Sequence, residues 1–148
     1  MHDIRIVSAE EVIAVRWPVL RAGLPRESAI FMGDTDVETR HFGAYVGEQI
    51  VGVASIYRAE LSEQPQATAW QLRGMATLDA ARGQGHGAAL LVATEDYARR
   101  SGAVLIWCNA RVTAAEFYRR HGWQMLGEVF DIPSVGPHYK MLRYFATA

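Results

Sequence analysis

Residues 81–91 read ARGQGHGAALL: three alternating glycines follow an arginine, and an alanine- and leucine-rich run follows the glycines. The preceding residues 67–78, ATAWQLRGMATL, have the composition of a strand, and the residues after the glycines favour a helix. A strand, a glycine turn and a helix N-terminus form an anion site, because the first helical N–H groups lack intrahelical partners and glycine lets a ligand approach the backbone. This stretch therefore predicts a phosphate-binding loop.

Two common phosphate-binding motifs do not account for the loop. A P-loop needs a lysine next to its last glycine, and the only lysine of the chain is Lys140. A dinucleotide fingerprint does match by letters, at Gly83, Gly85 and Ala88, but it requires an acidic residue about 20 positions further on. No Asp or Glu lies between Asp96 and Glu116. A dinucleotide-binding oxidoreductase is therefore a distant alternative.

The remaining sequence predicts a mixed sheet with helices on its faces. Ser8 and Glu11 form a capping box for a helix that Pro18 should kink or end, and residues 23–39 are expected to be irregular. A hairpin is expected over 41–59, and a glycine inside the 67–78 strand, Gly74, indicates a bulge. Further elements are expected as a helix over 88–100, a buried strand over 104–109, a helix opened by a Thr113–Glu116 capping box, and closing strands over 123–132 and 138–146. This order is typical of an α/β or α+β fold with a mostly antiparallel sheet.

Bulk composition restricts the class of protein. The chain has 148 residues, half of them hydrophobic, and a net charge of −1, which predicts one globular domain over 1–148 with neither nucleic acid nor a membrane as partner. Its single cysteine, Cys108, permits no internal disulfide and favours a cytoplasmic protein. No metal site is expected, and the sequence is compatible with a homodimer without fixing an oligomeric state.

The glycine loop and its surroundings resemble one family. RGQGHG (82–87) fits the R/Q-x-x-G-x-G/A signature of the GCN5-related N-acetyltransferases (GNAT), and NARVTAAEFYRRHGW (109–123) is similar to that family's second conserved stretch. IPSVGPHYKM (132–141) resembles the closing hairpin of many members. Two departures are Trp123 in place of the usual Phe and Leu78-Asp79 where many members have Asp-Pro. The resemblance covers about residues 72–123 and implies an acyl-CoA N-acyltransferase fold with six to seven strands.

The resemblance also implies a cosubstrate, acetyl-CoA, and the residues that would hold it. Backbone groups of Met75–Thr77 would polarise the thioester carbonyl, the glycine loop would hold the pyrophosphate, Asn109 would contact the pantetheine amides, and Arg111, Arg119 or Arg120 would reach the 3′-phosphate. His86 is expected to face solvent or phosphate. The implied cofactor-binding set is Met75, Ala76, Thr77, Arg82, Gly83, Gln84, Gly85, His86, Gly87, Ala88, Asn109 and Arg111.

In this family acetyl passes directly from thioester to amine. By resemblance, Tyr118 would act as the general acid for the leaving thiolate, since a phenol with a pKa of about 10 can protonate a thiolate of pKa about 8.5 at modest cost. Candidate bases are Glu60, His41 and His138, with water as an alternative. Cys108, in an apolar strand, is expected to belong to the core and not to be a nucleophile.

The acceptor is expected to be a small-molecule or peptide amine. The acidic stretch GDTDVET (33–39) would suit a cationic amine. A second class of function is a sensor or assembly module that binds acetyl-CoA without turnover. Such a module could dispense with Tyr118, so the presence of this tyrosine favours an enzyme.

Overall fold

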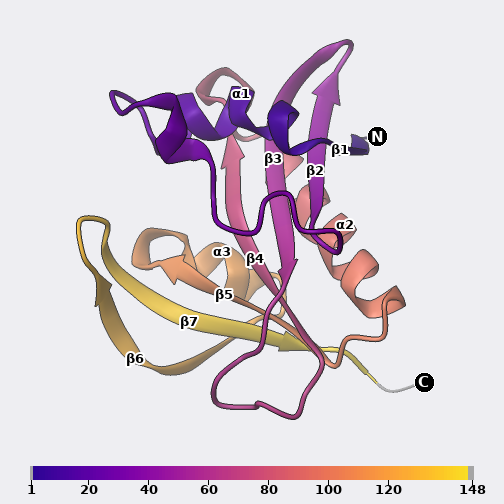
Figure 1. The fold of residues 1–148 in the computed structure, drawn as a ribbon, viewed down its shortest axis with the longest axis vertical. Helices are drawn as coiled ribbons and strands as arrows, with labels where there is room; N and C mark the ends of the chain where they lie inside the picture. The colour runs from indigo at the N-terminus through magenta and orange to yellow at the C-terminus, as the bar shows by residue number, and fades with distance from the viewer. Residues whose placement is uncertain (1, 147–148) are drawn as a thin grey trace. The chain divides into compact units, whose positions relative to one another are not determined.

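The computed structural model describes residues 2–146, and its elements alternate in the predicted order (Figure 1). The helices and strands are β1 (Asp3–Val7), α1 (Ala9–Leu20), η1 (Arg26–Ala29), β2 (Arg40–Val46), β3 (Gln49–Arg58), β4 (Ala69–Thr77), η2 (Asp79–Ala81), α2 (His86–Arg100), β5 (Leu105–Arg111), η3 (Val112–Ala114), α3 (Ala115–Arg120), β6 (Gln124–Ile132) and β7 (Gly136–Tyr144). The strands form a mixed, mostly antiparallel sheet in the order β1-β2-β3-β4-β5-β7-β6. The α/β class with a seven-stranded sheet is therefore confirmed.

The described chain divides into two compact units. The first contains the residues up to Arg58 together with Leu72–Tyr97, and the second contains Ala59–Gln71 together with the residues from Ala98 onward. Strand β4 changes from the second unit to the first between Gln71 and Leu72. The single domain over 1–148 stays a prediction.

The first unit is built on three strands, β1, β2 and β3, in which β2 pairs antiparallel with both β1 and β3. The β2–β3 turn falls at Gly47–Glu48, as the sequence predicts, and Gly47 has φ +60. Helix α1 starts at the predicted capping box: Ser8 Oγ accepts from the Glu11 N–H at 3.1 Å, and the Glu11 carboxylate accepts from the Ser8 N–H at 2.9 Å. The helix ends at Leu20, two residues after Pro18. Its buried face packs on the sheet through a cluster of Val12, Val15, Val53 and Ala76.

The second unit contains the strands β5, β7 and β6 and the helix α3. Strand β7 pairs antiparallel with both β5 and β6, while residues 69–71 of β4 pair in parallel with β5. Its core cluster consists of Leu61, Ala69, Leu105, Trp107 and Leu142. The predicted Thr113–Glu116 capping box is wrong: the turn η3 precedes α3, so Ala114 occupies the N-cap position without a side-chain cap.

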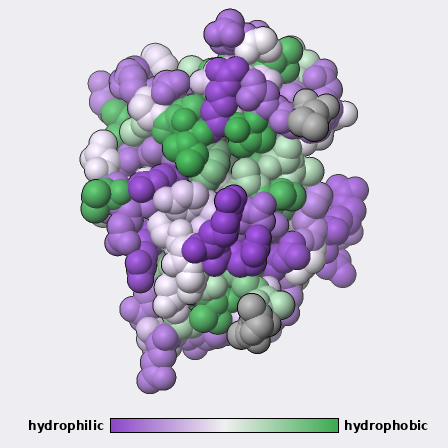
Figure 2. Space-filling model, turned by 90° about the vertical axis from the view of Figure 1, so that its right-hand side faces the viewer, coloured by the Kyte–Doolittle hydropathy of each residue, from purple (hydrophilic) through white to green (hydrophobic). Residues whose placement is uncertain are grey.

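On the face seen in Figure 2, neither hydrophilic nor hydrophobic residues dominate the surface. Hydrophilic residues (purple) and hydrophobic residues (green) are interspersed there. Exposed large hydrophobic side chains such as Ile6 and Val92 are ordinary for a folded chain. Among residues 2–146, no helix combines the length and the apolar character needed to cross a membrane.

Candidate acyl-CoA site

The glycine loop is an exposed turn directly before α2. Gly83 and Gly85 have φ of +77 and +86, a conformation that L side chains rarely adopt. Residues 82–85 are exposed, and the 15-residue helix α2 begins at His86, two residues earlier than predicted. The loop therefore presents bare backbone at a helix N-terminus, which suits a pyrophosphate. Arg82 adds a cation whose only ion pair within residues 2–146 is an exposed one with Asp79 at 3.2 Å.

Two histidines lie against this loop. The His2 ring donates from Nε2 to the Gln84 carbonyl oxygen at 2.7 Å, and its edge packs on the His86 ring with centroids 5.0 Å apart. His86 is buried, and within the described chain neither of its ring nitrogens has a hydrogen-bond partner. Of the two expectations for His86, exposure to solvent is wrong, because the residue is buried and packs against the His2 ring, and contact with phosphate stays a prediction. An unpaired buried imidazole is costly, and an anion at the loop would offer it an acceptor.

The residues expected to polarise a carbonyl follow Gly74, a glycine of positive φ inside β4. Gly74 has φ +68 inside the strand, which confirms the predicted irregularity. A Cβ at Gly74 would lie 2.9 Å from Arg16 Nε and 3.1 Å from the Phe31 ring, so no other residue fits without movement. Met75 and Thr77 are half-buried, and Ala76 is part of the core.

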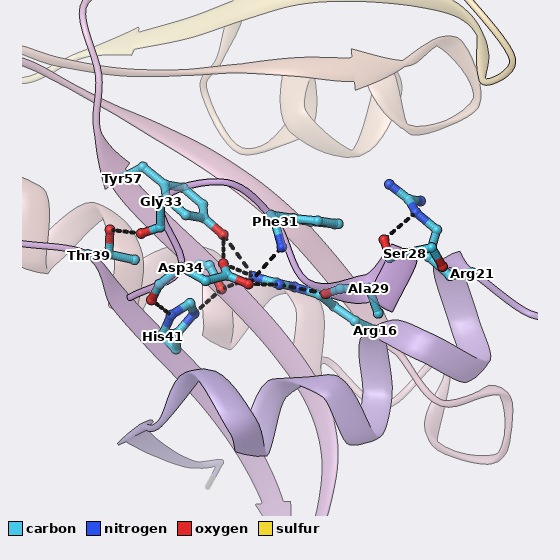
Figure 3. A network of polar contacts seen from close by, with 11 residues as sticks. Arg16, Arg21, Ser28, Ala29, Phe31, Gly33, Asp34, Thr39, His41 and Tyr57 are labelled. Atoms are coloured by element: carbon cyan, nitrogen blue, oxygen red, sulfur yellow. Dashed lines mark hydrogen bonds and ion pairs between the residues drawn. The ribbon is translucent and has the colours of Figure 1, made fainter. Parts of the chain in front are cut away.

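A buried polar network, which we call the Arg16 network, fills the space beside Gly74 in the first unit (Figure 3). It joins Arg16 of α1 to Asp34 of the loop before β2, His41 of β2, and Ser55 and Tyr57 of β3. Both terminal nitrogens of Arg16 donate to the Asp34 carboxylate, at 2.7 and 3.1 Å. Arg16 is fully buried, and its Nε has no partner within the described residues.

The hydrogen bonds of the network fix its protonation states. Arg16 donates to Ser55 Oγ at 2.9 Å, Ser55 Oγ lies 2.6 Å from His41 Nδ1, and His41 Nε2 donates to the Asp34 carbonyl oxygen at 2.8 Å. Burial lowers the pKa of His41 below its usual value, so the ring is neutral and Nδ1 accepts from Ser55. Burial would raise the pKa of Asp34, but hydrogen bonds from Arg16, Tyr57 and the Phe31 N–H outweigh it and the pKa is lowered. Burial raises the pKa of Tyr57.

These contacts affect two expectations from the sequence: His41 as a general base, and the acidic stretch 33–39 as a site for a cationic amine. Both ring nitrogens of His41 are engaged inside the protein, which leaves no lone pair for a substrate proton. The acidic stretch is also largely neutralised, since Asp34 pairs with Arg16 and Glu38 pairs with Arg58 at 2.9 Å. Asp36 is exposed and is the one acid of this stretch without an ion pair among the described residues, so the suitability of the stretch for a cationic amine stays a prediction that rests mainly on Asp36.

The remaining predicted residues lie in the second unit. Tyr118 and Cys108 are neighbours in the core of this unit, and both side chains are buried. Burial and the neighbouring Cys108 raise the pKa of Tyr118 well above its ordinary value, so the phenol keeps its proton at neutral pH. Burial likewise raises the pKa of Cys108, as expected for a core thiol. The Oδ1 of Asn109 is buried without a partner in the described chain and suits an amide N–H of a ligand.

The two other candidate bases differ in exposure. His138 is buried, and its Nδ1 donates to the Gly136 carbonyl oxygen at 2.8 Å, which leaves the lone pair on Nε2. Glu60 is exposed just after β3. Arg111, Arg119 and Arg120 are exposed, and Arg119 forms an ion pair with Glu116 at 3.1 Å.

Comparison with known proteins identifies the family. Residues 38–125 match the family model described as an acetyltransferase (GNAT) domain. The chain is 34% identical over 146 residues to YitI of Bacillus subtilis (strain 168), an uncharacterized N-acetyltransferase, with 97% of this chain and 98% of YitI covered. The chain therefore belongs to the GNAT acetyltransferase family and is an acyltransferase.

Solved structures of low sequence identity share the fold. Escherichia coli ElaA aligns with a TM-score of 0.77 at 18% identity, covering 97% of this chain and 99% of ElaA. An aminoglycoside 6'-N-acetyltransferase complexed with coenzyme A aligns with a TM-score of 0.79 at 14% identity, covering 99% and 98% of the two chains. These likenesses show that the chain shares the fold of those two proteins.

Sequence analysis did not single out three residues of the first unit: His2 beside the glycine loop, Arg16 in the buried network, and Arg73 beside Gly74 in β4. His2 contacts the loop across 82 positions, a separation that no local pattern reports. Arg16 did have a signal: it follows Val12 by four positions on the apolar face of α1, where a charge needs a buried partner.

Proposed function

We propose that this acyltransferase transfers acetyl from acetyl-CoA directly to an amine within a ternary complex. The observation that carries the proposal is the exposed Gly83–Gly85 turn at the start of α2, with the unpaired His86 ring behind it. The glycine-loop N–H groups and Arg82 would hold the pyrophosphate, and Asn109 would accept from a pantetheine amide. Acetyl-CoA supplies an activated thioester.

The chain's own groups would then guide the transfer. Backbone N–H groups after Gly74 would stabilise the charge that develops on the carbonyl oxygen. A new C–N bond forms as the C–S bond breaks, and the amine proton leaves to a base or to water. Tyr118 would give its proton to the departing sulfur and regain one from solvent. Burial raises the pKa of Tyr118, which keeps the phenol protonated at neutral pH but makes it a weaker acid than a free phenol. Glu60 and His138 remain the candidate bases because each has an available lone pair.

Two variants separate binding from chemistry. Gly85→Glu places a side chain and a negative charge at φ +86 in the loop, so the thermal shift given by acetyl-CoA should disappear. Tyr118→Phe should keep that shift and lower turnover, measured as thiol release with a panel of amines, by about 100-fold or more. Tyr144→Phe, on an exposed tyrosine, is the matched control and should leave turnover unchanged. Full activity of Tyr118→Phe would contradict the proposed acid. Binding of acetyl-CoA without turnover of any amine would instead favour the sensor.

A further inference from the structure

Arg73 of β4 lies over two aromatic rings of the first unit. Its guanidinium carbon is 4.7 Å from the centroid of Phe31 and 5.5 Å from that of Tyr57. The guanidinium of Arg16 stacks on the same Phe31 ring at 4.0 Å. The guanidinium carbon of Arg21 lies 5.2 Å from the same centroid, so three cations converge on one aromatic ring, and such an arrangement favours an anion nearby.

Among these three cations, Arg16 and Arg73 differ in how their charges are compensated. Arg16 is neutralised by the bidentate Asp34 carboxylate. Arg73 is half-buried, and within residues 2–146 it has no ion pair and no hydrogen bond, only its contacts with the two rings. A guanidinium stacked on a ring keeps its in-plane N–H groups available, and two of them match a carboxylate. The Phe31–Arg73–Tyr57 cluster therefore has the chemistry of a carboxylate-binding group.

The position of Arg73 relates this cluster to the acyl-transfer site. Arg73 directly precedes Gly74 and lies two residues before Met75, so its Cα is about 7 Å along the strand from the backbone proposed to polarise the carbonyl. All of these residues belong to the first unit. A molecule that carries an amine and a carboxylate on one carbon could present the amine to the thioester carbonyl while its carboxylate contacts Arg73.

We infer that the acceptor is an amine that also carries a carboxylate, as in a free amino acid, and that Arg73 binds that carboxylate. The inference rests on the proposed function and specifies its substrate class. It also agrees with the ion pairs of Asp34 and Glu38, one buried and one exposed, which make the acidic stretch less suited to hold a cation.

The test compares acceptors that differ only by the carboxylate: alanine with ethylamine, phenylalanine with phenethylamine, and lysine with cadaverine. Binding is measured calorimetrically in the presence of coenzyme A, and acetylation is measured as thiol release from acetyl-CoA. The native protein should prefer at least one acid to its amine by roughly 10- to 100-fold, the range of a hydrogen-bonded charge pair. Arg73→Met should abolish this preference by raising KM for the acid alone, and Arg73→Lys should keep part of it.

Controls separate this inference from the proposed function. Arg58→Met removes an exposed cation from the neighbouring strand β3 and should change neither acid nor amine. The thermal shift with acetyl-CoA should be the same in all variants. Acetylation of acids and amines without preference, or an equal loss of both in Arg73→Met, would overturn the inference and leave the proposed function standing. Failure of all three acids to bind would also overturn it.

Discussion

Replacing Asp34 by Asn should destabilise the protein strongly. The substitution removes the negative partner of a guanidinium that is fully buried, while the Asp34 side chain itself is only 3% exposed. Removing one partner of a buried ion pair costs about 3–5 kcal/mol, because the remaining charge is left uncompensated in a medium of low polarity. For a chain of this length each kcal/mol lowers the unfolding midpoint by about 2–4 °C, so we expect a decrease of about 6–20 °C.

The assay is thermal unfolding followed by circular dichroism near pH 7. Glu38→Gln is the matched control: it makes the same acid-to-amide change in the same loop, but its partner Arg58 is exposed, and the loss should stay within about 1 kcal/mol. The double variant Arg16→Met/Asp34→Asn should lose less than the sum of its single variants, because it leaves no buried charge. A midpoint for Asp34→Asn within about 2 °C of the native value would refute the reasoning, since the range above begins at about 6 °C.

Three further predictions concern His41, Gly74 and His2. Burial lowers the pKa of His41, so as the pH falls the unfolded chain binds a proton at this residue before the folded chain does. The contribution of neutral His41 to the free energy of unfolding is therefore fully present above about pH 6.5 and is lost as the pH falls below it. His41→Asn should flatten that part of the curve of unfolding midpoint against pH, and an unchanged slope would contradict the assignment. Gly74→Ala combines φ +68 with a 2.9 Å contact to Arg16 Nε and should cost about 2–4 kcal/mol in denaturant unfolding, against about 1 kcal/mol for Gly47→Ala, whose Cβ meets nothing. His2→Ala removes the hydrogen bond to Gln84 and should weaken acetyl-CoA about fivefold in calorimetry; equal affinity would show that His2 is dispensable.

Local patterns account for the parts of the fold that the sequence predicts well. The Ser8–Glu11 box, the turn at Gly47 and the irregular Gly74 each depend on residues within a few positions, and the structure contains all three. The glycine loop was predictable for the same reason. The Thr113 box failed because a competing turn, η3, occupies those residues.

Contacts between distant residues were beyond this reasoning. Asp34 stands in an acidic stretch typical of a surface, and nothing near it in sequence shows that Arg16, 18 positions earlier, draws it into the interior. Likewise, the burial of His86 depends on packing with His2. In both cases the local sequence suggested an exposed side chain, but contacts with residues distant in the sequence bury it.

The buried Cys108 gives the chain a convenient experimental property. It is the only thiol in the sequence, and burial both hides it and raises its pKa. A chromogenic disulfide reagent added to a reaction should therefore titrate released coenzyme A rapidly and the protein hardly at all. Slow labelling that does occur would time the transient opening of β5 and α3, so one reagent could record turnover in seconds and local unfolding over hours.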